Sequence, residues 1–106
     1  MPKFLIRGSY TPEGMKGLLK DKASGREREV AAACEAMGGK LDSLHYALGD
    51  DDVFVLVDMP SHVQMASLAV AVGTSGLVAT RTVPLLTVAE MDRALGEPPK
   101  YRPPGG

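Results

Sequence analysis

The short and almost wholly apolar stretch from Val53 to Met59 constrains the fold of this 106-residue chain more than any other feature. A turn rich in Gly and Asp at 49–52 precedes it, and Pro60 closes it. Successive side chains of a strand point to opposite faces, so the unbroken apolar run at 53–57 predicts a strand that is apolar on both faces. One face can be buried within the chain, and the other needs a cover.

The residues around this stretch predict a strand, a helix and a strand before it, and a helix and a strand after it. Alternating apolar residues and flanking turn signals predict the other strands, which are 3–10, 40–48 and 77–86. Capping signals and helical spacing predict the helices, which are a short one from Thr11, then 24–37, 61–72 and a terminal 87–95. A polar break at 20–23 separates the first two, and capping signals from Ser24 to Glu27 and from Thr87 to Glu90 open the second and the last. The short turn makes 40–48 and 53–59 an antiparallel hairpin. Pro84 places the last strand at an edge, or ends it.

This order of elements predicts an α+β fold of the ferredoxin-like βαββαβ type, in which two helices cover one face of a four-stranded antiparallel sheet. A strand exposed on one face should alternate apolar and polar residues, but 53–57 does not. A second copy of the sheet, packed face to face about a two-fold axis, is the simplest cover. We therefore expect a homodimer, with the terminal helix or the tail folding back over the sheet as the alternative.

Length and composition predict one domain at 1–96 and a proline-rich extended tail at 97–106. The formal net charge of −1 offers no basis for binding nucleic acid or an anionic membrane, and neither partner is expected. The apolar run at 63–72 is shorter than the roughly 20 residues that span a bilayer. The N-terminus lacks the apolar core of a signal peptide, and the single cysteine, Cys34, precludes an internal disulfide. These features predict a cytoplasmic protein.

The hairpin and the residues that follow it resemble the GYD domain family, whose members are small proteins of the dimeric α+β barrel type. Three segments carry the resemblance, which spans 3–95, and they are 6–14, 46–53 and 75–82. Gly49 and Asp52 fit the Gly-Tyr-Asp signature of the family, whereas Asp51 stands where the tyrosine would be. The resemblance implies a fold and a dimer, but no settled activity.

Two adjacent residues, His45 and Tyr46, are the candidates for catalysis. They point to opposite faces of a strand, so one faces the helices and the other faces the dimer interior. An imidazole there could act as a general base or contact a ligand, and a plain interface side chain is the alternative.

Arg7, Ser9 and Arg81 are the candidates for ligand binding. If Phe4 and Ile6 face the helices, Arg7 points into the space between two sheets, and Arg81 faces the same way. A half-buried arginine needs a partner, which is either an anionic ligand or an acidic side chain such as Asp42 or Asp58. An ion pair between subunits is the favoured interpretation.

The cluster Asp50, Asp51 and Asp52 is a weak candidate for a divalent metal, because carboxylates bind hard cations. A solvated hairpin turn is the favoured interpretation, since Asp tolerates turn dihedrals and caps backbone amides. Cys34 lies on the apolar side of a helix and is predicted to be a core residue.

The chain lacks a phosphate-binding glycine loop, a nucleophile elbow and a dinucleotide fingerprint, and we expect no cofactor. The sequence therefore predicts a homodimeric domain that binds a small organic ligand or a partner protein. The alternative is a cofactor-free monooxygenase or isomerase, which rests on fold analogy. That alternative requires a cavity of roughly 300 Å³ or more on which His45, Tyr46 or Arg7 converge.

Overall fold

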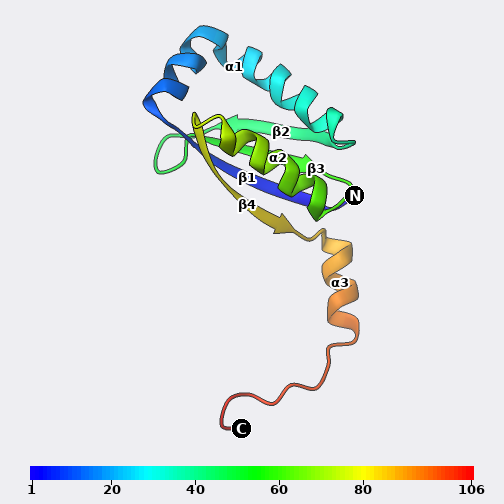
Figure 1. Ribbon diagram of the computed structural model, residues 1–106. Helices are drawn as coiled ribbons and strands as arrows, with labels where there is room; N and C mark the ends of the chain where they lie inside the picture. Colours follow the sequence, from blue (N-terminus) through cyan, green and yellow to red (C-terminus); the bar gives the residue numbers. More distant parts are fainter.

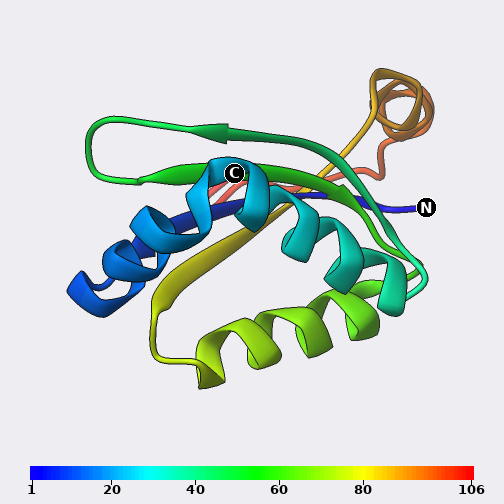
Figure 2. The ribbon, with the colours of Figure 1, turned by 90° about the horizontal axis from the view of Figure 1, so that it is seen from above.

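The computed structural model describes all 106 residues and shows a four-stranded antiparallel sheet with helices on one face (Figure 1). Its elements, in chain order, are β1 (Lys3–Tyr10), α1 (Pro12–Ala36), β2 (Lys40–Tyr46), β3 (Val53–Asp58), α2 (His62–Thr74), β4 (Val78–Leu85) and α3 (Val88–Gly96). The strand order is β2-β3-β1-β4, and α1 and α2 cover the same face (Figure 2). The predicted ferredoxin-like βαββαβ fold is confirmed, and Pro84 lies on an edge strand as expected.

The first helical region agrees with the prediction of two helices separated by a polar break. Element α1 consists of two helical segments on either side of Lys22, whose φ of 67° and ψ of 164° are not helical. Such a conformation favours glycine, and it kinks α1 within the predicted break at 20–23. The predicted capping box between Ser24 and Glu27 does not form, because the second segment starts directly after Lys22 and Ser24 already lies within its first turn.

The core lies between the two helices and the sheet. Eight apolar residues from β1, β3, their flanks and the helices form it, and they are Phe4, Cys34, Val53, Val55, Val57, Met59, Met65 and Leu68. Cys34 is fully buried, which confirms its prediction as a core residue and raises the pKa of its thiol. The core therefore uses the helix-facing half of the apolar stretch that constrained the fold.

The other half of that stretch lies on the sheet face that neither α1 nor α2 covers, which we call the open face. Along β3, Val53, Val55 and Val57 are buried, whereas Phe54 and Leu56 between them are half-buried. The antiparallel register places three further apolar residues on the open face, and they are Leu5, Val83 and Leu85. The predicted two-sided apolar strand is thus present, and its outer side has no cover within the chain.

The C-terminal part of the chain leaves the domain. Two residues separate α3 from β4, and α3 projects beyond the end of the sheet (Figure 1). Residues 97–106 continue as an exposed segment without helix or strand, apart from a turn. The molecule measures 56 × 32 × 23 Å, and its radius of gyration is 16.8 Å. A compact domain of this length has a radius of gyration of about 13 Å. The terminal helix therefore does not fold back over the sheet of its own chain.

Candidate functional site

A cavity of about 130 Å³ lies between the two helices and the sheet. Most of its lining is hydrophobic and comes from all four strands and both helices, including Ile6, Val55, Leu68 and Val72. Small residues on facing elements leave this space open, and they include Gly8, Ala33 and Ala69. The cavity is smaller than the volume expected for an enzyme of this fold, and none of His45, Tyr46 and Arg7 lines it.

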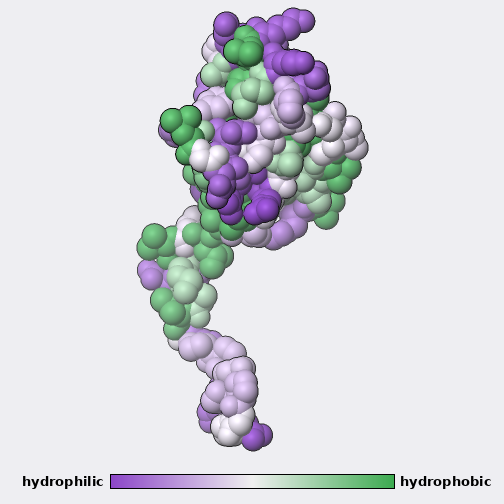
Figure 3. Space-filling view, turned by 90° about the vertical axis from the view of Figure 1, so that its left-hand side faces the viewer, coloured by the Kyte–Doolittle hydropathy of each residue, from purple (hydrophilic) through white to green (hydrophobic).

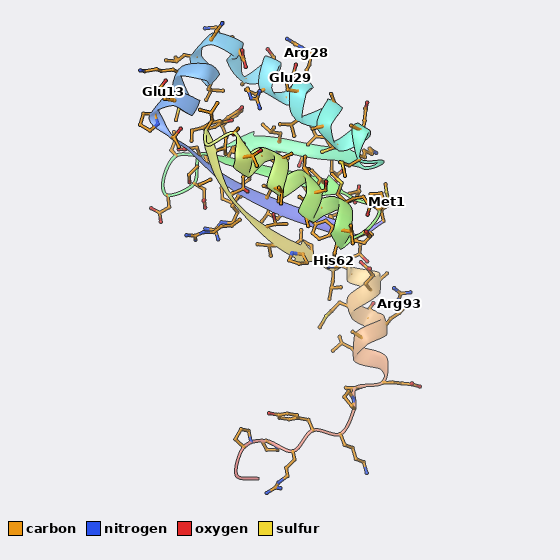
Figure 4. The ribbon with its side chains drawn as sticks, in the orientation of Figure 1. Met1, Glu13, Arg28, Glu29, His62 and Arg93 are labelled. Atoms are coloured by element: carbon orange, nitrogen blue, oxygen red, sulfur yellow. The ribbon has the colours of Figure 1, made fainter.

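Five side chains with polar groups also line the cavity, and they are Tyr10, Arg26, Glu29, Thr80 and Thr82. The threonines lie on the helix-facing side of β4, because their register partners on β1 are Gly8 and Ile6. Figure 4 shows Glu29 on α1, the helix that also carries Arg26. Hydroxyl groups donate and accept hydrogen bonds, so this lining suits an apolar molecule that carries a polar group.

Tyr46 and His45 point to opposite faces of β2, as the sequence predicted. The residue opposite Tyr46 on β3 is the buried Val53, which places Tyr46 on the helix side, near Tyr10. Burial, together with the neighbouring Tyr10 hydroxyl, raises the pKa of Tyr46 to about 12. A phenol with this pKa stays protonated near neutral pH and cannot serve there as a base. His45 pairs with Phe54, and is exposed on the open face.

Arg7 and Arg81 face each other across β1 and β4 on the open face. Asp51 neutralises Arg7, because its Oδ2 atom accepts hydrogen bonds from Nε at 2.9 Å and from Nη2 at 2.7 Å. Within the chain, Arg7 therefore pairs with Asp51 and not with Asp42 or Asp58, the acidic residues that the sequence suggested, and the expected ion pair between subunits stays a prediction. The turn between β2 and β3 is hydrogen-bonded to β1, because the Asp52 amide donates to the Gly8 carbonyl oxygen at 2.8 Å, and this pairing brings Asp51 to the guanidinium.

Lys3 forms ion pairs with Asp42 and Asp58, the two residues that the sequence suggested as partners of Arg7. Its Nζ lies 2.8 Å from an oxygen of Asp42 and 2.9 Å from an oxygen of Asp58. A register shift between Leu41 and Ser43 makes Asp42 the extra residue of a bulge in β2. The contacts to Asp42 and then Asp58 raise the pKa of Lys3, and Lys3 lowers the pKa of the Asp42 carboxyl.

Arg81 differs from the other two cations because no carboxylate of the chain lies within ion-pair distance of it. It is exposed, and it stands directly opposite the neutralised Arg7. Ser9, on the same face of β1, donates a hydrogen bond to the carbonyl oxygen of Asp50 at 3.1 Å. The three residues predicted to bind a ligand thus share the open face, but only Arg81 keeps its charge unpaired.

The Asp50, Asp51 and Asp52 cluster fastens the hairpin turn to β1. Asp51 holds Arg7, Asp52 accepts a hydrogen bond from the backbone amide of Tyr10 at 2.8 Å, and the backbone of Asp50 binds Ser9. The carboxylates of Asp51 and Asp52 bind separate partners, and no group of three or more His, Cys, Asp or Glu residues is arranged to hold a metal ion.

Sequence reasoning missed the cavity residues, including Tyr10, Thr80 and Thr82. The available signal was the threonine alternation at 80 and 82, which puts hydroxyls on the face that otherwise packs the core. The space between the elements depends on helix placement, and no local pattern specifies that placement.

Comparison with known families matches residues 4–95 to the GYD domain. The chain therefore belongs to the GYD domain family, as the hairpin and its flanking segments indicated. Neither the curated proteins nor the solved structures contain a match to it. None of its helices is both long and apolar enough to cross a membrane.

Proposed function

We propose that this GYD domain is a homodimeric binding protein for a small, largely apolar molecule that carries one polar group. The observation that supports ligand binding is the apolar cavity between the helices and the sheet. The observation that supports a homodimer is the uncovered apolar half of β3 on the open face.

The cavity has the size and chemistry of a site for one small ring. Its volume is about 130 Å³, and an apolar protein cavity of about 150 Å³ is able to hold a benzene molecule. Tyr10, Thr80 and Thr82 can hydrogen-bond to a hydroxyl or carbonyl group on such a ring. We therefore expect phenols or small lactones to bind better than benzene, and larger fused rings to be excluded.

Filling the cavity tests this binding site. Ala69 lines the cavity from α2, whereas Ala66 is exposed on the same helix. Ala69→Leu is expected to reduce phenol binding at least about tenfold in NMR titrations, and Ala66→Leu to leave it within about twofold. Equal phenol binding by both variants, or no binding to the wild type by any of phenol, a small lactone and benzene, contradicts the proposal.

The open face supports the homodimer. Its apolar residues from β1, β3 and β4 form a patch of the kind that soluble monomers rarely expose, and two copies related by a two-fold axis would cover each other's patch. The unpaired Arg81 lies on this face, where a carboxylate of the second copy can neutralise it. A dimer thus accounts for both the apolar patch and the unpaired cation.

Sedimentation analysis of two Leu-to-Asp variants tests the homodimer. Leu56→Asp puts a charge on the open face, and Leu48→Asp puts the same charge in the fully exposed turn. The first change is expected to leave a folded monomer, and the second a dimer like the wild type. A wild-type chain that sediments as a monomer at all concentrations would refute the dimer.

Catalysis has less support than binding. The two residues proposed as catalytic, His45 and Tyr46, lie on opposite faces of β2, and neither lines the cavity. A cofactor-free monooxygenase or isomerase needs acid–base groups within hydrogen-bond reach of its substrate. The positions of these two residues therefore favour a binding protein.

A further inference from the structure

The terminal helix α3 presents an uncovered apolar stripe. Val88, Met91 and Leu95 recur at helical spacing, and their exposed fractions are 81%, 45% and 62%. Glu90 and Arg93 lie on the other side of the helix. No residue of α3 is buried. A nine-residue helix is only marginally stable in water by itself, so the stripe is expected to need a surface to pack against.

The start of α3 is fixed by its own sequence. Thr87 and Glu90 form a capping box, in which the Thr87 hydroxyl accepts from the Glu90 amide at 3.1 Å and the Glu90 carboxylate accepts from the Thr87 amide at 2.8 Å. This bond also lowers the pKa of the Glu90 carboxyl. Only Leu86 and Thr87 separate β4 from the helix, and α3 continues past the end of the sheet instead of turning back over it (Figure 1).

The helix lies on the side of the open face. Figure 2 shows α3 beyond the sheet, on the side opposite to α1 and α2. Figure 3 shows hydrophobic residues along α3 and on the part of the domain that adjoins it. Leu86, between β4 and α3, is 64% exposed, and Val83 on the open face is 38% exposed. Exposed apolar residues thus connect the open face to α3 along the chain.

The open face by itself is small for a stable dimer. Four strands of up to eight residues span a footprint of roughly 500 Å², given about 3.3 Å per residue and about 4.8 Å between strands. Stable interfaces bury about 800 Å² on each partner. One face of α3 adds roughly 140 Å². Each copy would bury this face of its own α3 and also a matching area that receives the α3 of the partner, so the total per copy approaches the required area.

Charges also favour a second copy as the occupant. α3 carries Glu90, Asp92 and Arg93, an acidic balance that does not suit an anionic membrane surface. Asp92 lies beside the stripe and has no ion-pair partner, and Arg81 of the open face has none either. The helix thus offers an unpaired carboxylate for the unpaired Arg81 of a second copy.

We infer that α3 is a dimerisation arm, which packs its Val88, Met91 and Leu95 stripe against the second copy of the chain. The inference rests on the proposed homodimer and adds a second contact to the one between the open faces. Each arm extends past the end of its own sheet and covers apolar surface of the partner next to the sheet interface.

Sedimentation of stripe variants tests the arm. The double variant Met91→Ser, Leu95→Ser removes the stripe, and the control Ala89→Ser, Arg93→Gln alters the opposite side of the same helix. The stripe variant is expected to raise the dimer dissociation constant at least about tenfold, and the control to stay within about twofold. If the wild type is a dimer and the stripe variant matches it, the arm is refuted while the dimer stands. If the wild type is a monomer, both are refuted.

Cross-linking shows which chain the arm touches. A photoreactive group at Met91→Cys, in a Cys34→Ser background, is activated in dimers refolded from a mixture of ¹⁴N and ¹⁵N chains. Links between light and heavy chains are expected. Links confined to chains of one label would show that the helix contacts its own chain, and absence of any link would show that it contacts neither copy, so either result overturns the inference.

Discussion

The two faces of the sheet carry similar apolar strands but have different surroundings. On the helix side, Phe4 is 2% exposed and Val57 is fully buried. On the open face, Phe54 and Leu56 are half-buried, and they stand beside two ion-pair groups and the unpaired Arg81. The same residue types therefore stabilise the single chain on one side, and on the other they remain partly exposed on the face that we propose binds a second copy.

This contrast separates folding from assembly. Residues of the helix side contribute to stability at any protein concentration, because their partners belong to the same chain. In the proposed dimer, residues of the open face contribute fully only when the partner is bound, so their effect is expected to depend on concentration. The comparison between the two faces would fail if a helix-side variant lost stability in a concentration-dependent way, or if an open-face variant lost it independently of concentration.

The largest expected effect comes from the only two phenylalanines, which lie on opposite faces. Phe4→Ala should lower the free energy of unfolding by about 3–5 kcal/mol, because it opens a cavity in the core. Phe54→Ala should lower it by roughly 1–2 kcal/mol in dilute solution, and by more at concentrations that favour a dimer. Urea denaturation at two protein concentrations measures the loss of unfolding free energy for each variant. Equal losses for the two variants at both concentrations would contradict the contrast between the faces.

Two glycines of α1 give the next largest effect. A Cβ at Gly14 would lie 2.1 Å from the Leu77 carbonyl oxygen, whereas one at Gly17 would meet nothing within 4 Å. Gly14→Ala should destabilise the chain by roughly 1–3 kcal/mol, because the start of α1 must move away from the start of β4. Gly17→Ala should stabilise it by up to about 1 kcal/mol. Thermal unfolding of both variants checks the two signs, and the same sign for both would refute this close contact.

The N-caps of α2 and α3 give a smaller effect. Ser61 accepts a hydrogen bond from the Val63 amide, and Thr87 accepts one from the Glu90 amide. Ser61→Ala should cost about 1 kcal/mol of global stability, because Met65 and Leu68 couple α2 to the core. Thr87→Ala should change global stability by less than about 0.5 kcal/mol in dilute solution, since α3 can unfold separately. Hydrogen exchange distinguishes these outcomes, and equal protection of α2 and α3 in the dilute wild type would contradict them.

The smallest effect is the pH dependence of the Lys3 and Asp42 pair on the open face. The pKa of Asp42 is lower in the folded chain, so its stabilisation is present above about pH 4, the unfolded pKa, and is lost as pH falls through the folded value. The pKa of Lys3 is raised, so its contribution is present below its ordinary value of 10.5 and is lost as pH rises through the folded value.

Asp42→Asn therefore should be slightly less stable than the wild type at pH 7 and equally stable at pH 2. Denaturant titrations across this range measure the difference. A difference that persists at pH 2 would assign the effect of the substitution to the bulge geometry rather than to the charge.

The sequence was sufficient to predict much of the fold because its main signals are local. Alternation along 3–10, the apolar run at 53–57 and the short turn at 49–52 each specify strands and their pairing over a few residues. The Thr87 capping box and the edge position of Pro84 were predicted correctly for the same reason. The break near Lys22 was predicted correctly, but the capping box at Ser24 was not, because the second helical segment starts directly after Lys22.

The tertiary structure alone decided which charges pair and where space remains. Arg7 could have met any carboxylate of the open face, and the path of the turn selected Asp51 while the bulge gave Asp42 to Lys3. The cavity arises from the distance at which the two helices rest on the sheet. Pairing and packing of this kind join residues that are far apart in the sequence, so the chain determined its strands and helices locally, but its candidate site only after folding.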